Sequence, residues 1–351
     1  MGQARVSGAD PEVEVAVAGP TRSAGELAAI GARLRDAGLT TRALAAWAGT
    51  ARIAALPARI DGMPAAQLTP AGAILALFVG GAEVTGDRLH APPPLIDALI
   101  AHELVERDGD RLRARVAILP LGQALLVCDR LDAPIERALV CWPDDSSHHL
   151  ATAIPPGRRA DWLDLGCGSA FAPLARPELA TRIAGVDINE RAVRYAELGA
   201  KLSGIAHLAP SLGDVGALCE PAALVTCNAP IPDMPHVNRL RSPARPLATA
   251  FAEVWRNAEP GLFDRLWPAL QRAVRPGGMI VVHAACEAVL PVLEDARGER
   301  VVVTYTPANV RGFAVAWWRP DAPDRFVAAR RELLPDRPHV DPRDREEALA
   351  C

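Results

Sequence analysis

The first third of the chain carries apolar residues at helical spacing. Leu27, Ile30 and Leu34 lie three to four residues apart with charged residues between them, and Gly38 suits the end of such a helix. Three further helices, and a strand after a glycine turn, are expected at Arg42–Leu56, Pro70–Val79, Leu95–Glu106 and Leu112–Leu119. Helices followed by a short hairpin predict a mostly helical, winged-helix-like unit.

Beyond residue 160, short apolar runs alternate with amphipathic segments. Seven strands are expected, at Asp161–Leu165, Arg182–Val186, Ile205–Ala209, Ala222–Cys227, Met279–Ala284, Val301–Thr306 and Phe313–Trp318. Helices are expected between them at Asn189–Ser203 and Pro260–Val274. This alternation predicts an α/β fold, in which a Rossmann-like, mainly parallel sheet carries helices on both faces.

The length of 351 residues corresponds to about two domains at roughly 150 residues each. Residues 141–160 are rich in proline and include the polar run Asp144–His149, which is typical of a connector. The predicted organisation is a flexible tail (1–20), a helical unit (21–140), the connector (141–160), a sheet domain (161–320) and a C-terminal extension (321–351).

Charge argues against a nucleic-acid partner. Lys and Arg total 38 against 42 Asp and Glu, and neither half of the chain is basic. Binding to a nucleic-acid backbone is driven by clustered positive charge, which this composition does not supply.

The cysteine pattern and the hydropathy point to the cytoplasm. The seven cysteines form no CxxC pair, so we expect reduced thiols and no bound metal. Ala71–Val79 is the most apolar run and is far shorter than the ~20 residues of a membrane span. Met1–Val17 carries acidic residues and no apolar core, unlike a signal peptide.

A glycine turn carries the first chemical signal. The segment Asp164-Leu165-Gly166-Cys167-Gly168 follows a predicted strand and precedes a helix, and small residues there let a ligand approach the backbone. Asp187 ends the next strand, where a carboxylate can accept both hydroxyls of a ribose. Together these features predict a nucleoside site.

The order of acid and glycines distinguishes this turn from the dinucleotide pattern, which needs a third glycine near Pro173. The turn and the acidic strand end resemble those of the class I S-adenosylmethionine-dependent methyltransferases over Ala160–Arg319. The resemblance implies S-adenosylmethionine as cofactor and a seven-stranded sheet. Asp164 would orient the methionine ammonium, and Gly166 and Gly168 would make room for the methionine and ribose.

The same resemblance gives roles to three further residues. Asp187 would bind the ribose hydroxyls, and Ile188 would pack on the adenine. Asp214 would accept a hydrogen bond from the adenine amino group. For Asp214 a solvated loop carboxylate is the alternative, because only one acidic residue supports the assignment.

A second signal ends the fourth strand of the sheet domain, at Asn228-Ala229-Pro230-Ile231. It resembles the Asn-Pro-Pro-aromatic motif of methyltransferases that modify amide or amino nitrogens, such as the glutamine N5-methyltransferases. By that resemblance Asn228 and the Ala229 carbonyl would accept hydrogen bonds from the target nitrogen, and Pro230 matches. Ile231 has no ring to stack on a planar acceptor, which argues against glutamine or adenine. A turn cap before Pro230 is the alternative role of Asn228.

The acceptor is weakly encoded. Methyl transfer mainly needs alignment, with a base for some acceptors. His236, His148 and His149 are candidate bases or substrate contacts, although an isolated histidine is more often a surface residue. We expect methyl transfer to nitrogen or oxygen of a small-molecule or peptide-like acceptor.

Two other functions compete with this one. The first is a protein or nucleic-acid N-methyltransferase, which the Asn-x-Pro pattern alone would favour. The second is a winged-helix regulator that senses S-adenosylmethionine. Its recognition helix would be Leu95–Glu106, which holds three acids and no Lys or Arg, whereas the wing over residues 107–115 holds four arginines. The N-terminal unit could instead cover the acceptor site or form a homodimer contact.

Overall fold

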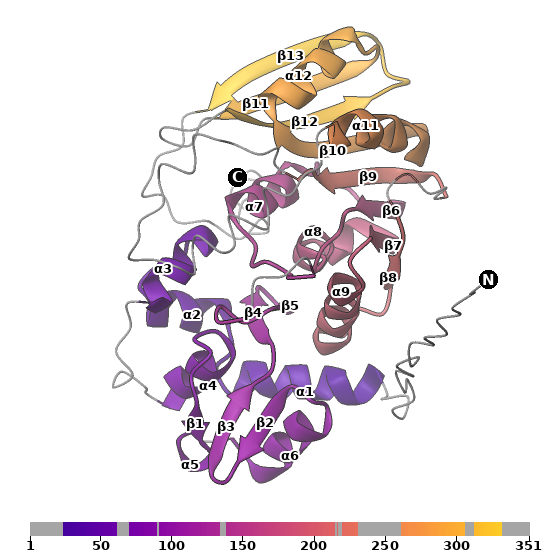
Figure 1. Cartoon of the computed structure of the whole chain (residues 1–351). Helices are drawn as coiled ribbons and strands as arrows, with labels where there is room; N and C mark the ends of the chain where they lie inside the picture. Colours follow the sequence, from indigo (N-terminus) through magenta and orange to yellow (C-terminus); the bar gives the residue numbers. More distant parts are fainter. Residues whose placement is uncertain are drawn as a thin grey trace, which may run out of the picture.

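The computed structural model describes residues 24–61, 70–89, 91–133, 138–214, 216, 220–230, 261–305 and 312–331. The tail expected at 1–20 lies outside them. Within these residues the fold consists of one large sheet flanked by helices, with a group of smaller elements from the N-terminal part of the chain beside it (Figure 1).

The large sheet has the order β13-β11-β12-β10-β9-β6-β7-β8. Its strands are β6 (Arg159–Leu165), β7 (Ala180–Asp187), β8 (Leu208–Leu212), β9 (Ala222–Asn228), β10 (Val274–Ala285), β11 (Glu299–Tyr305), β12 (Phe313–Arg319) and β13 (Arg325–Arg331). Strands β6 to β10 are parallel, and β12 is antiparallel to both β10 and β11. The fold is therefore α/β and Rossmann-like.

The sheet has eight described strands where seven were predicted. The additional strand is β13, which pairs in parallel with β11 and comes from the segment expected to be a C-terminal extension. Its sequence, Arg-Phe-Val-Ala-Ala-Arg-Arg, shows no clean alternation of apolar and polar residues, because both of its faces are largely exposed. The periodicity that identified the other strands is absent there.

Helices cover both faces of the sheet. On one face, α7 (Asp145–Ala153) contacts β9, β10 and β12, and α9 (Glu190–Ser203) contacts β7 and β8. The short helix α8 (Phe171–Ala175) touches α7 and α9. On the other face, α11 (Leu262–Ala273) and α12 (Cys286–Asp295) pack against β10. Neighbouring residues of the central strands therefore point into different cores, as Trp162 and Leu163 of β6 do.

The N-terminal elements form two small sheets and six helices among the described residues. The helices are α1 (Ala24–Asp36), α2 (Thr41–Ala48), α3 (Leu56–Asp61), α4 (Pro70–Phe78), α5 (Gly86–Leu89) and α6 (Pro93–Ala101), with a 3-10 turn at Ile53–Ala55. One sheet has the order β1-β3-β2, and the other pairs β4 with β5. Their strands are β1 (Val84–Thr85), β2 (Val105–Asp108), β3 (Arg111–Ala114), β4 (Ala117–Leu121) and β5 (Ala124–Cys128).

Three predicted boundaries in this part were wrong. The helix expected to reach Glu106 ends at Ala101, because Glu103 takes a left-handed conformation and Val105 begins β2. The helix expected over Arg42–Leu56 stops at Ala48, where Gly49 has a φ of 62° and caps the helix end. The strand expected over Leu112–Leu119 is divided between β3 and β4.

The segment expected to be a connector contains helix α7. Proline residues flank this helix and its first turn is polar, so the sequence resembles a loop. Asp144 is the N-cap, and its Oδ1 accepts hydrogen bonds from the backbone N–H groups of Ser146 (2.8 Å) and Ser147 (3.3 Å). These bonds satisfy donors that the first turn of a helix otherwise leaves open.

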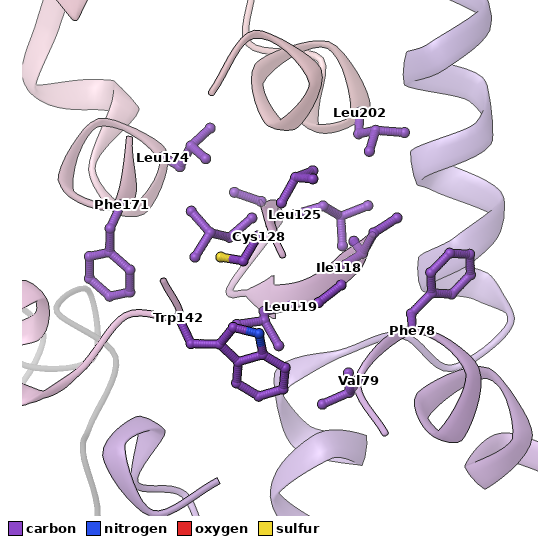
Figure 2. Close-up of a cluster of buried hydrophobic side chains, with 14 of the residues drawn as sticks. Phe78, Val79, Ile118, Leu119, Leu125, Cys128, Trp142, Phe171, Leu174 and Leu202 are labelled. Atoms are coloured by element: carbon purple, nitrogen blue, oxygen red, sulfur yellow. The ribbon is translucent and has the colours of Figure 1, made fainter. Parts of the chain in front are cut away.

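The N-terminal elements share one hydrophobic core with the large sheet. Figure 2 shows side chains of β4 and β5, such as Ile118 and Leu125, packed among Leu174 of α8 and Leu202 of α9. The backbones approach closely: a Cβ at Gly31 of α1 would overlap the carbonyl oxygen of Leu202. Helix α9 therefore lies between the N-terminal elements and the sheet. No helix among the described residues is both long and apolar enough to cross a membrane.

Candidate active site

A cavity of about 1020 Å³ opens at the carboxyl ends of β6, β7 and β9. This is where ligands bind in parallel α/β sheets, because the chain reverses strand order there. Residues of the glycine turn, the start of α9, the start of α7, helix α11 and the segment 138–142 form its wall. The volume is sufficient for a nucleoside-sized ligand together with a second small molecule.

The glycine turn after β6 requires its glycines. Gly166 and Gly168 have φ angles of 66° and 53°, a conformation that residues with a side chain rarely adopt. A Cβ at either position would meet nothing within 4 Å, so the backbone borders open space. A ligand in the cavity can therefore approach the backbone of this turn closely.

The carboxyl group of Asp187, at the end of the neighbouring strand β7, is hydrogen-bonded to the glycine turn. Its two carboxyl oxygens accept one hydrogen bond each, from the backbone N–H of Gly168 (2.8 Å) and of Asn189 (2.9 Å). Burial raises the pKa of this carboxyl. Asn189 caps α9 with its Oδ1 and donates from Nδ2 to the carbonyl of Ala138 at 3.0 Å. The carboxylate is thus fixed in direction and can accept from a pair of hydroxyl groups.

Asp164 is the buried acid of the site, with 4% of its surface exposed. The indole N–H of Trp162 donates to Thr226 Oγ1 at 2.7 Å, so the Thr226 hydroxyl donates in turn to Asp164 Oδ1 at 2.5 Å. Burial raises the pKa of Asp164 to about 7, although the bond from Thr226 opposes this shift. A ligand cation placed beside Asp164 would favour its ionised form.

The far end of the cavity offers an apolar surface and a second acid. Ile188 follows Asp187 and is 70% exposed, which is unusual for a large aliphatic side chain. Asp214 also lines the cavity, and its Oδ1 accepts from the backbone N–H of Gly216 at 2.7 Å. A flat, nitrogen-rich ring could pack on Ile188 and donate to Asp214.

Asn228 lies at the other end of the cavity, at the end of β9. Its Nδ2 donates to Ser146 Oγ at 2.9 Å and lies 3.4 Å from Ser147 Oγ, both at the start of α7. The Ser146 hydroxyl donates to Asp144 Oδ1. Burial raises the pKa of Asp144, against the hydrogen bonds from both serines.

The cavity wall at 138–142 is held in place by Asp129, a residue from the N-terminal part of the chain whose exposure is 6%. Asp129 accepts from the backbone N–H of Val140 (2.7 Å), from Tyr195 Oη (2.8 Å) and from Arg191 Nη1 (3.3 Å). Its carbonyl accepts from Trp142 Nε1 at 2.8 Å. One buried carboxylate therefore ties the cavity wall at 138–142 to helix α9.

The structure brings most of the predicted site residues to this one cavity. Those that line it are Asp164, Gly166, Gly168, Asp187, Ile188, Asp214, Asn228, Ala229 and Pro230. Ile231 and His236 lie outside the described residues. His148 and His149 are on α7 and do not form part of the cavity wall; the His149 ring packs against Tyr305 with centroids 4.7 Å apart.

Several residues that build the site belong to no recognisable sequence motif, namely Thr226, Ser146 and the cavity wall at 138–142. Asp144 was the available signal, because Asp is among the residues preferred at a helix N-cap. Among the described residues, no group of three or more His, Cys, Asp or Glu side chains is placed to hold a metal ion.

Comparison with known proteins gives similarity to solved methyltransferase structures at low identity. A tRNA methyltransferase from M. jannaschii is 14% identical, with 59% of each chain covered and a TM-score of 0.38. A predicted O-methyltransferase from Agrobacterium tumefaciens is 15% identical, with 54% of this chain and 86% of that chain covered and a TM-score of 0.37. A putative class I S-adenosylmethionine-dependent methyltransferase from Listeria monocytogenes is 16% identical, with coverage of 59% and 69% and a TM-score of 0.36.

No protein-family model matches the sequence, and no curated protein matches it. The chain spans 59% of the length of the M. jannaschii enzyme. Similarity this low defines no acceptor, so the residues of the cavity carry the functional assignment.

Proposed function

We propose that this chain is an S-adenosylmethionine-dependent methyltransferase. The observation that carries the proposal is the pairing of Asp187 with the Gly168 N–H beside the buried Asp164, within one cavity of about 1020 Å³. The two acids lie on either side of a turn with open space in front of it, where Asp187 could accept hydroxyl groups and Asp164 an ammonium. A nucleoside joined to an amino acid has the groups that both acids require.

The residues present fit this cofactor at four points. Asp164 would hold the methionine ammonium, Asp187 the ribose hydroxyls, Ile188 one face of the adenine and Asp214 its amino group. When bound, S-adenosylmethionine supplies a methyl group on a sulfonium, which is transferred as the carbon–sulfur bond breaks. The turn and the acids would hold the cofactor so that its methyl group faces the part of the cavity that Asn228 lines, and such alignment is the main requirement of a displacement.

The acceptor we propose is a nitrogen or oxygen of a small-molecule or peptide-like compound. Asn228 lines the cavity as the Asn-x-Pro pattern requires, which supports a nitrogen acceptor. The same pattern leaves a protein or nucleic-acid N-methyltransferase as the alternative. The net charge of −4 argues against the nucleic-acid branch.

The regulator remains the alternative of another class. The order of helices and strands from α4 to β3 supports a winged-helix-like N-terminal unit. However, the four wing arginines are ion-paired within the chain: Arg111 to Glu83 at 3.0 Å, and Arg107, Arg113 and Arg115 to nearby acids at 3.2 to 3.9 Å. These neighbouring acids offset the positive charge of the wing, so the enzyme is favoured over a DNA-binding protein.

Replacing Asp187 tests the cofactor assignment. Asp187→Ala removes a charged acceptor for the ribose hydroxyls, so the binding free energy of S-adenosylhomocysteine should fall by roughly 1.5–3 kcal/mol. Calorimetric titration of wild type and variant measures this loss, and Asp108→Ala, an exposed acid of β2, is the control. If the wild type binds neither S-adenosylhomocysteine nor S-adenosylmethionine, the methyltransferase proposal is wrong.

The affinity for S-adenosylhomocysteine should depend on pH through Asp164. The ligand ammonium needs the ionised carboxylate, whereas a pKa of about 7 keeps the free protein largely protonated below neutrality. Affinity should therefore rise between pH 5.5 and 8, by roughly tenfold for each pH unit below 7. Titrations across this range test the expectation, and Asp164→Asn should bind weakly with a flat pH profile. A sloping profile in that variant would assign the effect to another group.

A further inference from the structure

We propose that Asp144 and Ser146 are positioning residues that fix the direction of the Asn228 side-chain amide, so that its Oδ1 selects an acceptor atom that carries a hydrogen. The proposal rests on the methyltransferase function above and narrows its acceptor class. It assigns a role to the start of α7, which the sequence motifs leave without one.

The direction of the amide follows from the hydrogen-bond chemistry of its neighbours. The Oδ1 of Asp144 already accepts the backbone N–H of Ser146 at 2.8 Å, and it can only accept from the Ser146 hydroxyl as well. The hydroxyl proton is thereby used, so Ser146 Oγ presents a lone pair to Asn228. The Asn228 atom at 2.9 Å must then be the donor Nδ2, which leaves Oδ1 as the amide atom available to a ligand.

Both sides of this contact stand on rigid elements. Asn228 is paired with His283 on β10, and the Ala229 N–H donates to the His283 carbonyl at 2.9 Å. Helix α7 packs on β9 and β10, and its His149 ring lies against Tyr305. Tyr305 Oη is 2.5 Å from Nε2 of the buried His283. An amide held between such elements keeps its orientation when a ligand enters.

The consequence concerns the atom that receives the methyl group. A free Oδ1 attracts an N–H donor and repels an oxygen that carries only lone pairs. An amine or amide nitrogen held by this bond can direct its remaining electron pair at the methyl carbon and release a proton to water after transfer. A carboxylate oxygen has no hydrogen to donate, so the site disfavours methyl esters as products.

NMR of the asparagine side-chain amides reports directly on the hydrogen bond between Asn228 and Ser146. The chain has five asparagines (Asn189, Asn228, Asn238, Asn257 and Asn309), so protein labelled with ¹⁵N at asparagine gives few amide pairs, and Asn228→Asp identifies the relevant one. Ser146→Ala should shift this pair and speed its hydrogen exchange roughly threefold to tenfold. Ser147→Ala, an equal truncation at a contact of 3.4 Å, should have a smaller effect.

Asp144 both caps α7 and accepts the Ser146 hydroxyl, so its variants are compared with Ser146→Ala, which keeps the capping carboxylate. Asp144→Asn keeps an oxygen at the position that accepts all three donors, so the Asn228 signals should stay close to those of wild type. Asp144→Ala should reproduce the exchange of Ser146→Ala. If Ser146→Ala leaves the Asn228 signals unchanged, the proposal is overturned, whether or not the protein binds S-adenosylhomocysteine.

The acceptor preference is tested with two small probes of equal shape. With S-adenosylhomocysteine saturating, acetamide should shift the Asn228 amide signals of the wild type, whereas acetate should not. Ser146→Ala should lose this discrimination. Equal effects of the two probes on the wild type, including no effect of either, overturn the selectivity. If S-adenosylhomocysteine does not bind at all, the proposed function is contradicted. The hydrogen-exchange experiment on the Asn228 amide then still tests whether Asp144 and Ser146 orient that side chain.

Discussion

Asp129→Ala is expected to lower both the stability of the protein and its affinity for S-adenosylhomocysteine. Three donors lose their acceptor at once: the Val140 backbone, Tyr195 and the Arg191 guanidinium. Removing one partner of a buried charged network costs about 3–5 kcal/mol, because the buried donors lose the acceptor that they share. The cavity wall at 138–142 then loses its tie to α9, so the ligand meets a less ordered surface.

Chemical denaturation with urea measures the first effect and calorimetric titration the second. Asp97→Ala is the control, because the Asp97 side chain is 70% exposed and its ion pair with Arg107 is long, at 3.9 Å. Such a surface pair contributes about 0–1 kcal/mol. A variant of Asp129 that is destabilised but binds the ligand with unchanged affinity would show that the wall plays no part in binding.

Gly31→Ala is expected to separate α1 from α9. The added methyl group would overlap the Leu202 carbonyl, and backbone cannot yield as a flexible side chain can. Overpacking of a core costs about 1–3 kcal/mol and more where backbone must move, which places this substitution at about 3 kcal/mol. The melting temperature should then fall by about 4 °C if the chain of 351 residues unfolds as one unit, because an unfolding entropy of roughly 2.1 cal/mol/K per residue sums to about 0.74 kcal/mol/K.

Gly25→Ala provides a matched control in the same helix. A Cβ at Gly25 would meet nothing within 4 Å, so alanine should leave the melting temperature unchanged or raise it slightly. Thermal unfolding followed by circular dichroism compares the two variants. Equal melting temperatures for both would mean that α1 is not docked on α9 in solution.

The parallel sheet and the end of the cavity at the glycine turn were predictable because local rules determine them. Asp164, Gly166 and Gly168 had to lie at one strand end, and Asp187 had to end the neighbouring strand, since successive parallel strands are joined through helices. Nine predicted site residues line the cavity for this reason. Their positions follow from strand order, which periodicity reveals.

The other parts of the site depend on contacts between segments that are far apart in the sequence. Ser146 meets Asn228 across 82 positions, and Asp129 meets Tyr195 across 66. Neither contact leaves a spacing rule in the sequence. Helix α7 was mistaken for a connector because its polar first turn is satisfied by Asp144 and by Asn228, and polar runs between prolines are otherwise typical of loops.

The additional strand, β13, determines which side chains lie at one edge of the large sheet. Among the described strands, β13 is the outermost on its side, and an outer strand can pair with another chain through its unused backbone groups. Arg325 begins this strand, and Arg330 and Arg331 end it. Antiparallel pairing of two such strands would bring these like charges together. The edge that lengthens the sheet therefore also opposes its growth into larger aggregates.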